Sequence, residues 1–108
     1  MLTMKWIEGR QGGNYSKLRL MEYKFIDCWI IRYEPYYEMP EHTDPVENKR
    51  HYRMNIVFGG KGKFICERTI VNILGRFVIF RPDLYKHKMV NGKRRRYVLS
   101  IGWAIRSL

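Results

Sequence analysis

Apolar and polar residues alternate along this chain in short runs, with a period of two rather than the 3.6 of a helix. Other short runs are rich in aromatic and β-branched residues and are bounded by glycine or proline. No segment of three helical turns carries an apolar stripe with caps. The pattern predicts strands at residues 2–8, 17–21, 25–33, 51–58, 63–71, 75–80, 87–90 and 94–105. We therefore expect one all-β domain, a sandwich or barrel with little helix, over residues 1–108.

Turn-forming residues separate these runs. Glycine, asparagine and serine are frequent in residues 10–16, and three glycines fall within residues 59–62. The dipeptide Asn91-Gly92 predicts a tight hairpin that pairs the strand at 87–90 with the last strand. Residues 34–50 hold three of the four prolines. We expect irregular backbone or an edge strand there, because proline cannot donate a ladder hydrogen bond.

The last predicted strand has two different faces, because side chains alternate across a strand. The small or polar face carries Arg94, Arg96, Val98, Ser100, Gly102 and Ala104. The bulky face carries Arg95, Tyr97, Leu99, Ile101, Trp103 and Ile105. We expect the bulky face to pack between sheets or against the N-terminal strands. The other face, headed by arginine, is suited to lining a site that holds an acid.

Charge is unevenly distributed. The chain has a formal charge of +11, and residues 61–108 carry 12 Lys and Arg against 2 Asp and Glu. A basic surface of this kind favours an acidic partner, with nucleic acid as the first candidate. No apolar run reaches the ~18–20 residues that a membrane span needs. Cys28 and Cys66 are too few for a disulfide scaffold or a cysteine-based zinc site, so we interpret them as core thiols of a cytoplasmic protein.

The segment His42-Thr43-Asp44 is the strongest candidate for chemistry. In an extended segment, residues i and i+2 point to the same side, so this imidazole and carboxylate can share a cation. His87, which begins a later strand, is the candidate third ligand, reaching them across the barrel. Two histidines and one carboxylate form the facial triad that suits Fe(II) with positions left open. The alternative for His87 is a surface position beside Lys86 and Lys88.

Several other polar residues are candidates for binding an acid at such a site. Arg96, nine residues after His87, is best placed for bidentate capture of a carboxylate, and Arg94 is second. Tyr33 closes the strand that leads toward the His-x-Asp segment and has a phenol to donate. Asn55 lies in an otherwise apolar strand and needs hydrogen-bond partners, which backbone or a ligand could supply. A further histidine, at position 51 in a charged run, is expected at the surface.

These pieces together resemble the 2-oxoglutarate/Fe(II)-dependent dioxygenase superfamily over residues 25–105. The matching stretches are Arg32-Tyr33, His42-Thr43-Asp44, Gly59-Gly60-Lys61-Gly62-Lys63-Phe64, GRFVIF at 75–80, His87, and Arg94–Arg96 with YVLSIGW at 97–103. The resemblance implies a distorted double-stranded β-helix, that is, a jelly roll or cupin-like barrel. It further implies that His42, Asp44 and His87 hold Fe(II), with no catalytic residue beyond the metal ligands. It implies 2-oxoglutarate bound by Arg96 and Tyr33, with Arg94 and Asn55 as further candidates.

The implied reaction couples oxidative decarboxylation of 2-oxoglutarate, giving succinate and CO2, to hydroxylation or demethylation of a substrate, for which nucleic acid or a nucleotide is a candidate. The chain is short for that family, whose members usually add N-terminal helices that brace the main sheet. The resemblance therefore implies either that a partner chain completes the domain or that catalysis is lost while the fold and the metal are kept. Two alternatives stay open. One is a catalytically inactive jelly roll that binds nucleic acid or an acidic protein through its basic half. The other is a cupin-like protein with Zn or Mn at the same ligands.

Overall fold

The chain is built from strands alone wherever the structure describes it. The computed structural model describes residues 6–8, 15–44, 49–60 and 62–106. The strands are β1 Trp6–Glu8, β2 Tyr15–Tyr23, β3 Ile26–Tyr33, β4 Glu38–His42, β5 Lys49–Gly59, β6 Gly62–Cys66, β7 Val71–Ile73, β8 Phe77–Phe80, β9 His87–Asn91 and β10 Arg96–Arg106. Among these residues there is no helix, and therefore none long and apolar enough to cross a membrane. The all-β prediction is confirmed.

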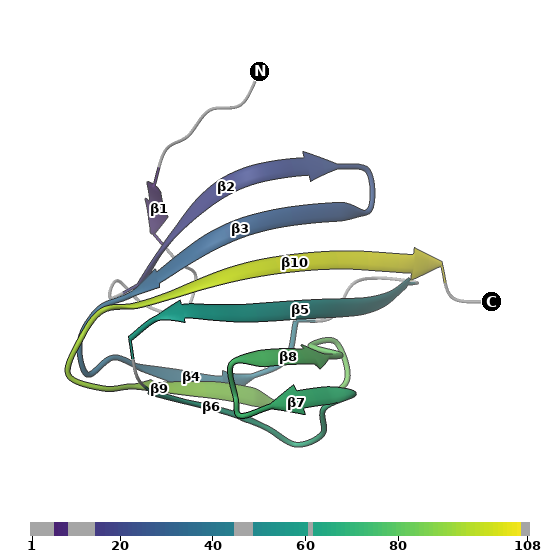
Figure 1. Cartoon of the computed structure of the whole chain (residues 1–108). Helices are drawn as coiled ribbons and strands as arrows, with labels where there is room; N and C mark the ends of the chain where they lie inside the picture. Colours follow the sequence, from purple (N-terminus) through teal and green to yellow (C-terminus); the bar gives the residue numbers. More distant parts are fainter. Residues whose placement is uncertain (1–5, 9–14, 45–48, 61, 107–108) are drawn as a thin grey trace.

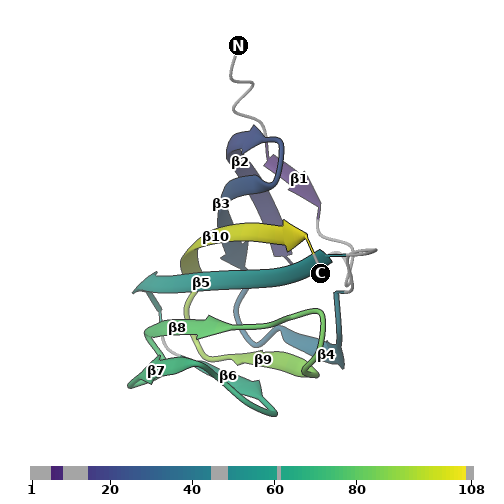
Figure 2. The ribbon, with the colours of Figure 1, turned by 90° about the vertical axis from the view of Figure 1, so that its right-hand side faces the viewer.

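Two antiparallel sheets face each other. The larger has seven strands in the order β1-β2-β3-β10-β5-β8-β7, and the smaller has three in the order β4-β9-β6. Figure 1 shows the larger sheet in front, with β10 in its middle, and Figure 2 shows β4, β9 and β6 of the smaller sheet below β5 and β8. The interior between the sheets is where side chains from both can meet.

The period-two pattern of the last strand is present in β10, but its consequence differs from our expectation. Arg96, Val98, Ser100 and Gly102 are all buried, so the small and polar face points into the interior. The bulky face points outward, and its members are only half-buried or exposed. The expectation that this bulky face packs inside the protein is therefore wrong. Met39 of β4 and Met89 of β9 pack instead with Val98, on the inward face of β10.

The predicted hairpin at Asn91-Gly92 is not formed. β9 belongs to the smaller sheet and β10 to the larger, so the segment between them is a crossover. The Asn91 side-chain amide donates to the backbone carbonyls of Tyr33 at 3.2 Å, Glu34 at 2.7 Å and Arg94 at 3.1 Å. Buried asparagine thus ties two crossovers together instead of forming a turn. The long-range hydrogen bonds of Asn91, rather than the local preference of Asn-Gly for a turn, therefore determine the structure at this position.

Other element bounds differ in informative ways. The proline-rich stretch does contain a strand, β4, at the edge of the smaller sheet, which is where proline is tolerated. The run expected at 63–71 is divided, since β6 ends at Cys66 and β7 begins at Val71. The predicted start of the first strand and most of the connection at 10–16 lie outside the described residues.

The core is unusually rich in tyrosine. Tyr15, Tyr33 and Tyr37 are buried, with ring centroids 5.5 to 6.2 Å apart. The remaining buried members of this cluster are Ile31, Met39, Met89 and Val98. The pKa of Tyr33 is raised well above its ordinary value, and burial is the largest cause. The phenol therefore stays protonated and can donate a hydrogen bond at neutral pH. The two cysteines are free thiols and half-buried, so neither is a fully buried core thiol.

Candidate metal site

Three predicted ligands come together at one end of the smaller sheet. The Nε2 atoms of His42 and His87 lie 3.5 and 3.4 Å from the same oxygen, Oδ2 of Asp44. One potential ligand atom from each residue lies within 4.8 Å of the others. His42 and His87 are cross-strand partners on β4 and β9, with ring centroids 4.4 Å apart. His87 is therefore a buried neighbour of His42 in one sheet, rather than a surface residue or one reaching across the barrel.

Backbone carbonyls orient both imidazoles. His42 Nδ1 lies 2.7 Å from the carbonyl oxygen of Pro40, and His87 Nδ1 lies 3.1 Å from that of Tyr85. A carbonyl oxygen only accepts, so each Nδ1 carries the proton that it donates. This arrangement turns Nε2 of both rings toward Asp44 and is the outer support that metal-binding histidines commonly have.

Asp44 is fixed by the backbone as well. Its N–H donates to the carbonyl oxygen of Pro82 at 2.7 Å, which attaches the segment after β4 to the turn after β8. Burial by itself opposes ionisation of the carboxyl group. The hydrogen bonds and charges of His42 and His87 outweigh it and hold the pKa of Asp44 well below its usual range. The carboxylate is therefore ionised and available as an oxygen ligand at neutral pH.

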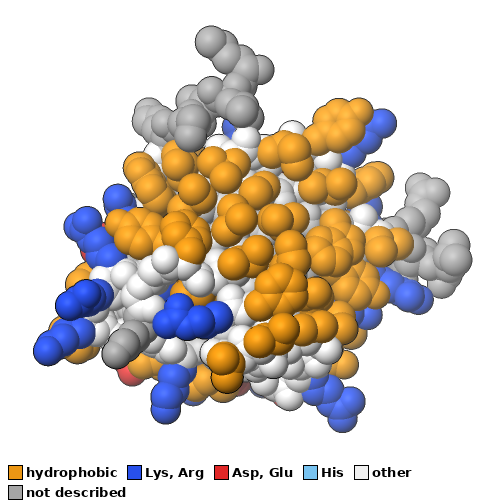
Figure 3. All heavy atoms as spheres, in the orientation of Figure 1, with side chains coloured by type: hydrophobic (Ala, Val, Ile, Leu, Met, Phe, Trp, Pro, Cys, Tyr) orange, Lys and Arg blue, Asp and Glu red, His pale blue; other side chains and the backbone are white. Residues whose placement is uncertain are grey.

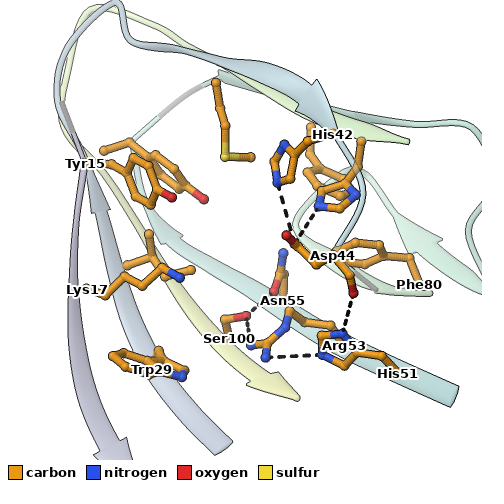
Figure 4. Close-up of a pocket in the computed structure, with 15 residues that line it drawn as sticks. Tyr15, Lys17, Trp29, His42, Asp44, His51, Arg53, Asn55, Phe80 and Ser100 are labelled. Carbon is orange, nitrogen blue, oxygen red and sulfur yellow. Dashed lines mark hydrogen bonds and ion pairs between the residues drawn. The ribbon is translucent and has the colours of Figure 1, made fainter. Parts of the chain in front are cut away.

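A cavity of about 130 Å³ lies against this cluster. Figure 4 shows Tyr15 and Lys17 reaching into it from β2, opposite His42 and Asp44. Trp29 of β3 lines the same wall, and the Lys17 ammonium lies 5.5 Å from the centre of its ring. The cavity thus has imidazoles and a carboxylate on one side and a cation with aromatic rings on the other.

The third side of the cavity is a polar network on the larger sheet. Arg53 of β5 donates to Asp27 Oδ1 at 2.7 Å and to the Ser100 hydroxyl at 2.8 Å. Ser100, which is fully buried, donates in turn to Asn55 Oδ1 at 2.7 Å. Asn55 is therefore satisfied by a side chain of the neighbouring strand while still lining the cavity. The network fixes the guanidinium of Arg53 with the support of a carboxylate.

His51 also lines this cavity, contrary to the expected surface position. Its Nδ1 lies 3.4 Å from the Asp44 carbonyl oxygen, and its Nε2 lies 3.5 Å from an Arg53 nitrogen. Burial first, and the Arg53 cation second, lower its pKa below the ordinary value. The signal that would have found His51 and Arg53 is parity, because positions 51, 53 and 55 share one face of β5.

Arg96 lies deeper in the interior and does not line the main cavity. It is only 4% exposed, and its Nε has no hydrogen-bond partner. It pairs across the strands with Tyr33, and it borders a small second cavity that shares Tyr33, Asn55 and Phe64 with the first. Burial lowers the pKa of Arg96 below its ordinary value, and the nearby Tyr33 opposes this shift. Among the described residues, no carboxylate forms an ion pair with this guanidinium.

Arg94 lies apart from both cavities. It precedes β10, is exposed, and lines a separate surface groove with Gly60, Arg76 and Lys93. Of the two arginines that the sequence offered as co-substrate anchors, only Arg96 points into the interior. Arg95, between them, is exposed and paired with Glu34 at 2.8 Å.

Known structures share this architecture. A predicted oxalate decarboxylase from Thermotoga maritima matches with a TM-score of 0.64 and 15% identity, over 98% of this chain and 94% of that one. KdgF from Halomonas sp. matches with a TM-score of 0.63 and 14% identity, over 95% and 87%. An RmlC-like cupin protein from Desulfovibrio desulfuricans matches with a TM-score of 0.61 and 13% identity, over 82% and 81%.

No protein-family model matches the sequence, and no curated protein matches it. The structural likenesses, all at low identity, define the class of fold: a cupin-type jelly roll. Within this class, the His42, Asp44 and His87 cluster is a group that could hold a metal ion.

Proposed function

We propose that this protein is a metal-dependent oxygenase of the jelly-roll fold, which uses Fe(II) and 2-oxoglutarate. The observation that carries the proposal is the combination of two features in one interior. One is the cluster of His42, Asp44 and His87. The other is the buried, acid-free guanidinium of Arg96 beside Tyr33. The first feature suits a divalent cation, and the second suits a carboxylate.

The donor set fits the cation. Two imidazole nitrogens and one carboxylate oxygen match the two-histidine, one-carboxylate arrangement of non-haem Fe(II) oxygenases. The two Nε2 atoms lie 3.5 and 3.4 Å from one oxygen of Asp44, and the three potential ligand atoms lie within 4.8 Å of one another, so one cation could contact all three residues. The supporting Nδ1 contacts leave both Nε2 atoms directed at the centre of the cluster.

The donor set also fits the acid. An unpaired buried donor is costly, so a guanidinium that lacks a carboxylate in the free protein is suited to receive one from a ligand. Tyr33 remains protonated and borders both cavities, so it can donate to the same carboxylate. Asn55 and Phe64 lie between the two cavities, where the ligand chain would pass. Arg94 is left out of this proposal because of its exposed position.

When bound, Fe(II) and 2-oxoglutarate would supply the oxidising chemistry through oxidative decarboxylation. The protein's own residues then have three tasks. His42, Asp44 and His87 would hold the cation at the wall of the cavity that they line. Arg96 and Tyr33 orient the acid. Lys17 and Trp29, on the opposite wall, contact the substrate to be oxidised.

The decisive experiment measures succinate from 2-oxoglutarate with Fe(II) present, alongside calorimetric titration of metal binding. The wild type should bind Fe(II) and form succinate, and a variant with both His42→Ala and His87→Ala should do neither. His51→Ala is the matched control, because it removes an imidazole from the same cavity but none of the three ligands. Metal binding that persists in the double variant, with no succinate from the wild type, would refute the proposal.

A non-oxygenase cupin with Zn or Mn at the same ligands is the alternative at this site, since cupin-type structures share the fold. Elemental analysis of protein purified under anaerobic conditions separates the two. Zn or Mn at one equivalent, together with no enhancement of metal affinity by 2-oxoglutarate, would favour the alternative.

A second candidate function is binding of nucleic acid, either as the substrate or as a partner of an inactive protein. The observation in its favour is the surface groove of about 550 Å³ lined by Gly60, Arg76, Lys93 and Arg94, in the basic half of the chain. Binding dominated by phosphates should weaken steeply as salt increases. An affinity for single-stranded oligonucleotides that does not change between about 50 and 200 mM salt would argue against it.

A further inference from the structure

The outer face of the larger sheet carries continuous apolar rows. Cross-strand partners lie side by side on one face of a sheet, so the register defines these rows. The longest crosses all seven strands: Trp6, Leu18, Ile30, Leu99, Ile56, Phe77 and Ile73. The next consists of Met21, Cys28, Ile101, Met54, Ile79 and Val71. A third consists of Tyr23, Ile26, Trp103 and Tyr52. We call these three rows the outer apolar face.

The outer apolar face is open in the single chain. None of its residues is classed as buried, and Tyr23 at its margin is 63% exposed. Figure 3, in the orientation of Figure 1, shows hydrophobic side chains gathered over β2, β3, β10 and β5. An antiparallel sheet with one face on the core normally has polar residues on the other. Here the inner face carries polar side chains such as Arg53 and Ser100 while the outer face is apolar, so the outer face is expected to be covered.

The dimensions fit a protein interface. The first row crosses seven strands ~4.8 Å apart and is about 29 Å wide, whereas the second crosses six strands and the third four, which gives about 24 and 14 Å. Along β10 the rows extend from Leu99 to Trp103, about 14 Å at ~3.4 Å per residue. The flat footprint is therefore roughly 300 Å², and side chains standing on it add accessible area toward the ~800 Å² that each partner buries in a standard interface. Contiguous apolar patches of a few hundred Å² on a single chain are often interaction sites.

Charge identifies the kind of partner. The three rows contain no Lys, Arg, Asp or Glu, although the chain as a whole carries +11. Cations lie at the margin, where Arg32 stacks on Trp6, Lys24 on Tyr23 and Arg81 on Tyr52. An acidic partner or a nucleic acid would find no complementary charge on this face. It fits another flat apolar surface, and the chain provides one in its own outer apolar face.

The symmetry of the sheet suits that pairing. β10 is the central strand, with three strands on each side, so a two-fold axis through β10 places one half of each face on the other half of its partner. Sheets that pack face to face lie about 10 Å apart, with strands within about 30° of each other. We propose that this chain forms a homodimer in which the outer apolar faces of two copies pack together. The proposal does not depend on metal or on catalysis.

The test is the mass in solution of the full chain, by sedimentation between about 1 and 100 µM, where mass action reveals a dimer. We expect twice the 13.2 kDa of one chain at the upper concentrations. Because the copies repel through their positive charge, association should strengthen as salt screens that charge, which is opposite to nucleic-acid binding. A single-chain mass at every concentration and salt would overturn the proposal.

The variant Ile101→Glu places a charge at the centre of the face and should give a single-chain mass with an unchanged far-UV circular dichroism spectrum. Ile65→Glu is the matched control, because Ile65 is 43% exposed and lies in β6 of the smaller sheet, so that this variant should leave the dimer intact. If Ile65→Glu dissociated the dimer as completely as Ile101→Glu, the interface would lie elsewhere.

Thiol labelling of the unmodified protein gives an independent readout in case Ile101→Glu does not fold. Cys28 lies in the second row of the outer apolar face, whereas Cys66 lies in the smaller sheet. Alkylation of Cys28, followed by mass spectrometry, should slow as protein concentration rises, while alkylation of Cys66 should not. Equal behaviour of the two thiols would count against packing through this face.

Discussion

We expect that Arg96 lowers the stability of the ligand-free protein and that its guanidinium serves to bind a ligand. Its side chain is 4% exposed, its Nε has no partner, and the pKa of its guanidinium is lowered by burial. A buried donor left unsatisfied costs about 1–3 kcal/mol. The small cavity beside it is lined by apolar Val57, Val78 and Met89, among which a methionine side chain would pack. We therefore expect Arg96→Met to raise the free energy of unfolding by about 1–3 kcal/mol.

The same variant should lose the acid. Each hydrogen bond to a charged group contributes about 1.5–3 kcal/mol, so removing two from a bound carboxylate should weaken 2-oxoglutarate by more than about 100-fold. Metal binding should change little, because His42, Asp44 and His87 are untouched. We therefore expect this one substitution to raise the stability of the protein and to lower its affinity for 2-oxoglutarate.

Two measurements check this. Thermal unfolding should show a higher midpoint, by about 4–8 °C for each kcal/mol in a domain of this size. Calorimetry with Fe(II), or Mn(II) in its place, should show the loss of 2-oxoglutarate binding. Arg95→Met is the control, since Arg95 is exposed and should affect neither quantity much. Lower stability of Arg96→Met than of Arg95→Met would show that the guanidinium has a structural partner. Normal 2-oxoglutarate affinity would show that the guanidinium does not bind the acid. Either result would refute the reasoning.

Three further outcomes are expected. Asn91→Ala removes an amide that joins three backbone carbonyls and should lower the free energy of unfolding by about 1–3 kcal/mol, measured by urea denaturation. Gly102→Ala places a Cβ into the Arg53 guanidinium; succinate formation should fall while metal affinity, measured by calorimetry, stays near that of the wild type. Asp44→Asn leaves the imidazoles in place but removes the ionised oxygen ligand, so metal affinity should fall at least about 10-fold, and unchanged affinity would exclude Asp44 as a ligand.

The parts of this structure that sequence predicts well are those with local causes. Strand alternation placed Arg96 and Ser100 on one face of β10 and His42 and Asp44 on one side of their segment, and the structure has both arrangements. The proximity of His87 to that pair was also predicted, but with His87 reaching the pair from across the barrel. The actual route is direct pairing of β4 with β9, which depends on strands 45 residues apart in register and has no local signal.

The parts that sequence missed depend on which strands are neighbours. Arg53, His51 and Lys17 line the cavity only because β2, β5 and the smaller sheet face one another. The outer face shows a different limit. In a strand with one apolar face, that face is normally expected to pack in the core. β10 instead places its bulky residues outward and its arginine and serine inward. Burial in an assembly, rather than in the single chain, is the physical reason that we propose for this inversion.

The position of His42 and His87 has a mechanical consequence. β4 is a short edge strand with a proline in its middle, and its register with β9 shifts between Met39 and His42. Backbone hydrogen bonding at this edge is therefore sparse. A cation bound by both His42 and His87 would cross-link the two strands at the point where their backbone hydrogen bonds are sparse. Loading and loss of the ion would then set how easily this edge of the jelly roll opens, so that access to the cavity and occupancy of the site are controlled together.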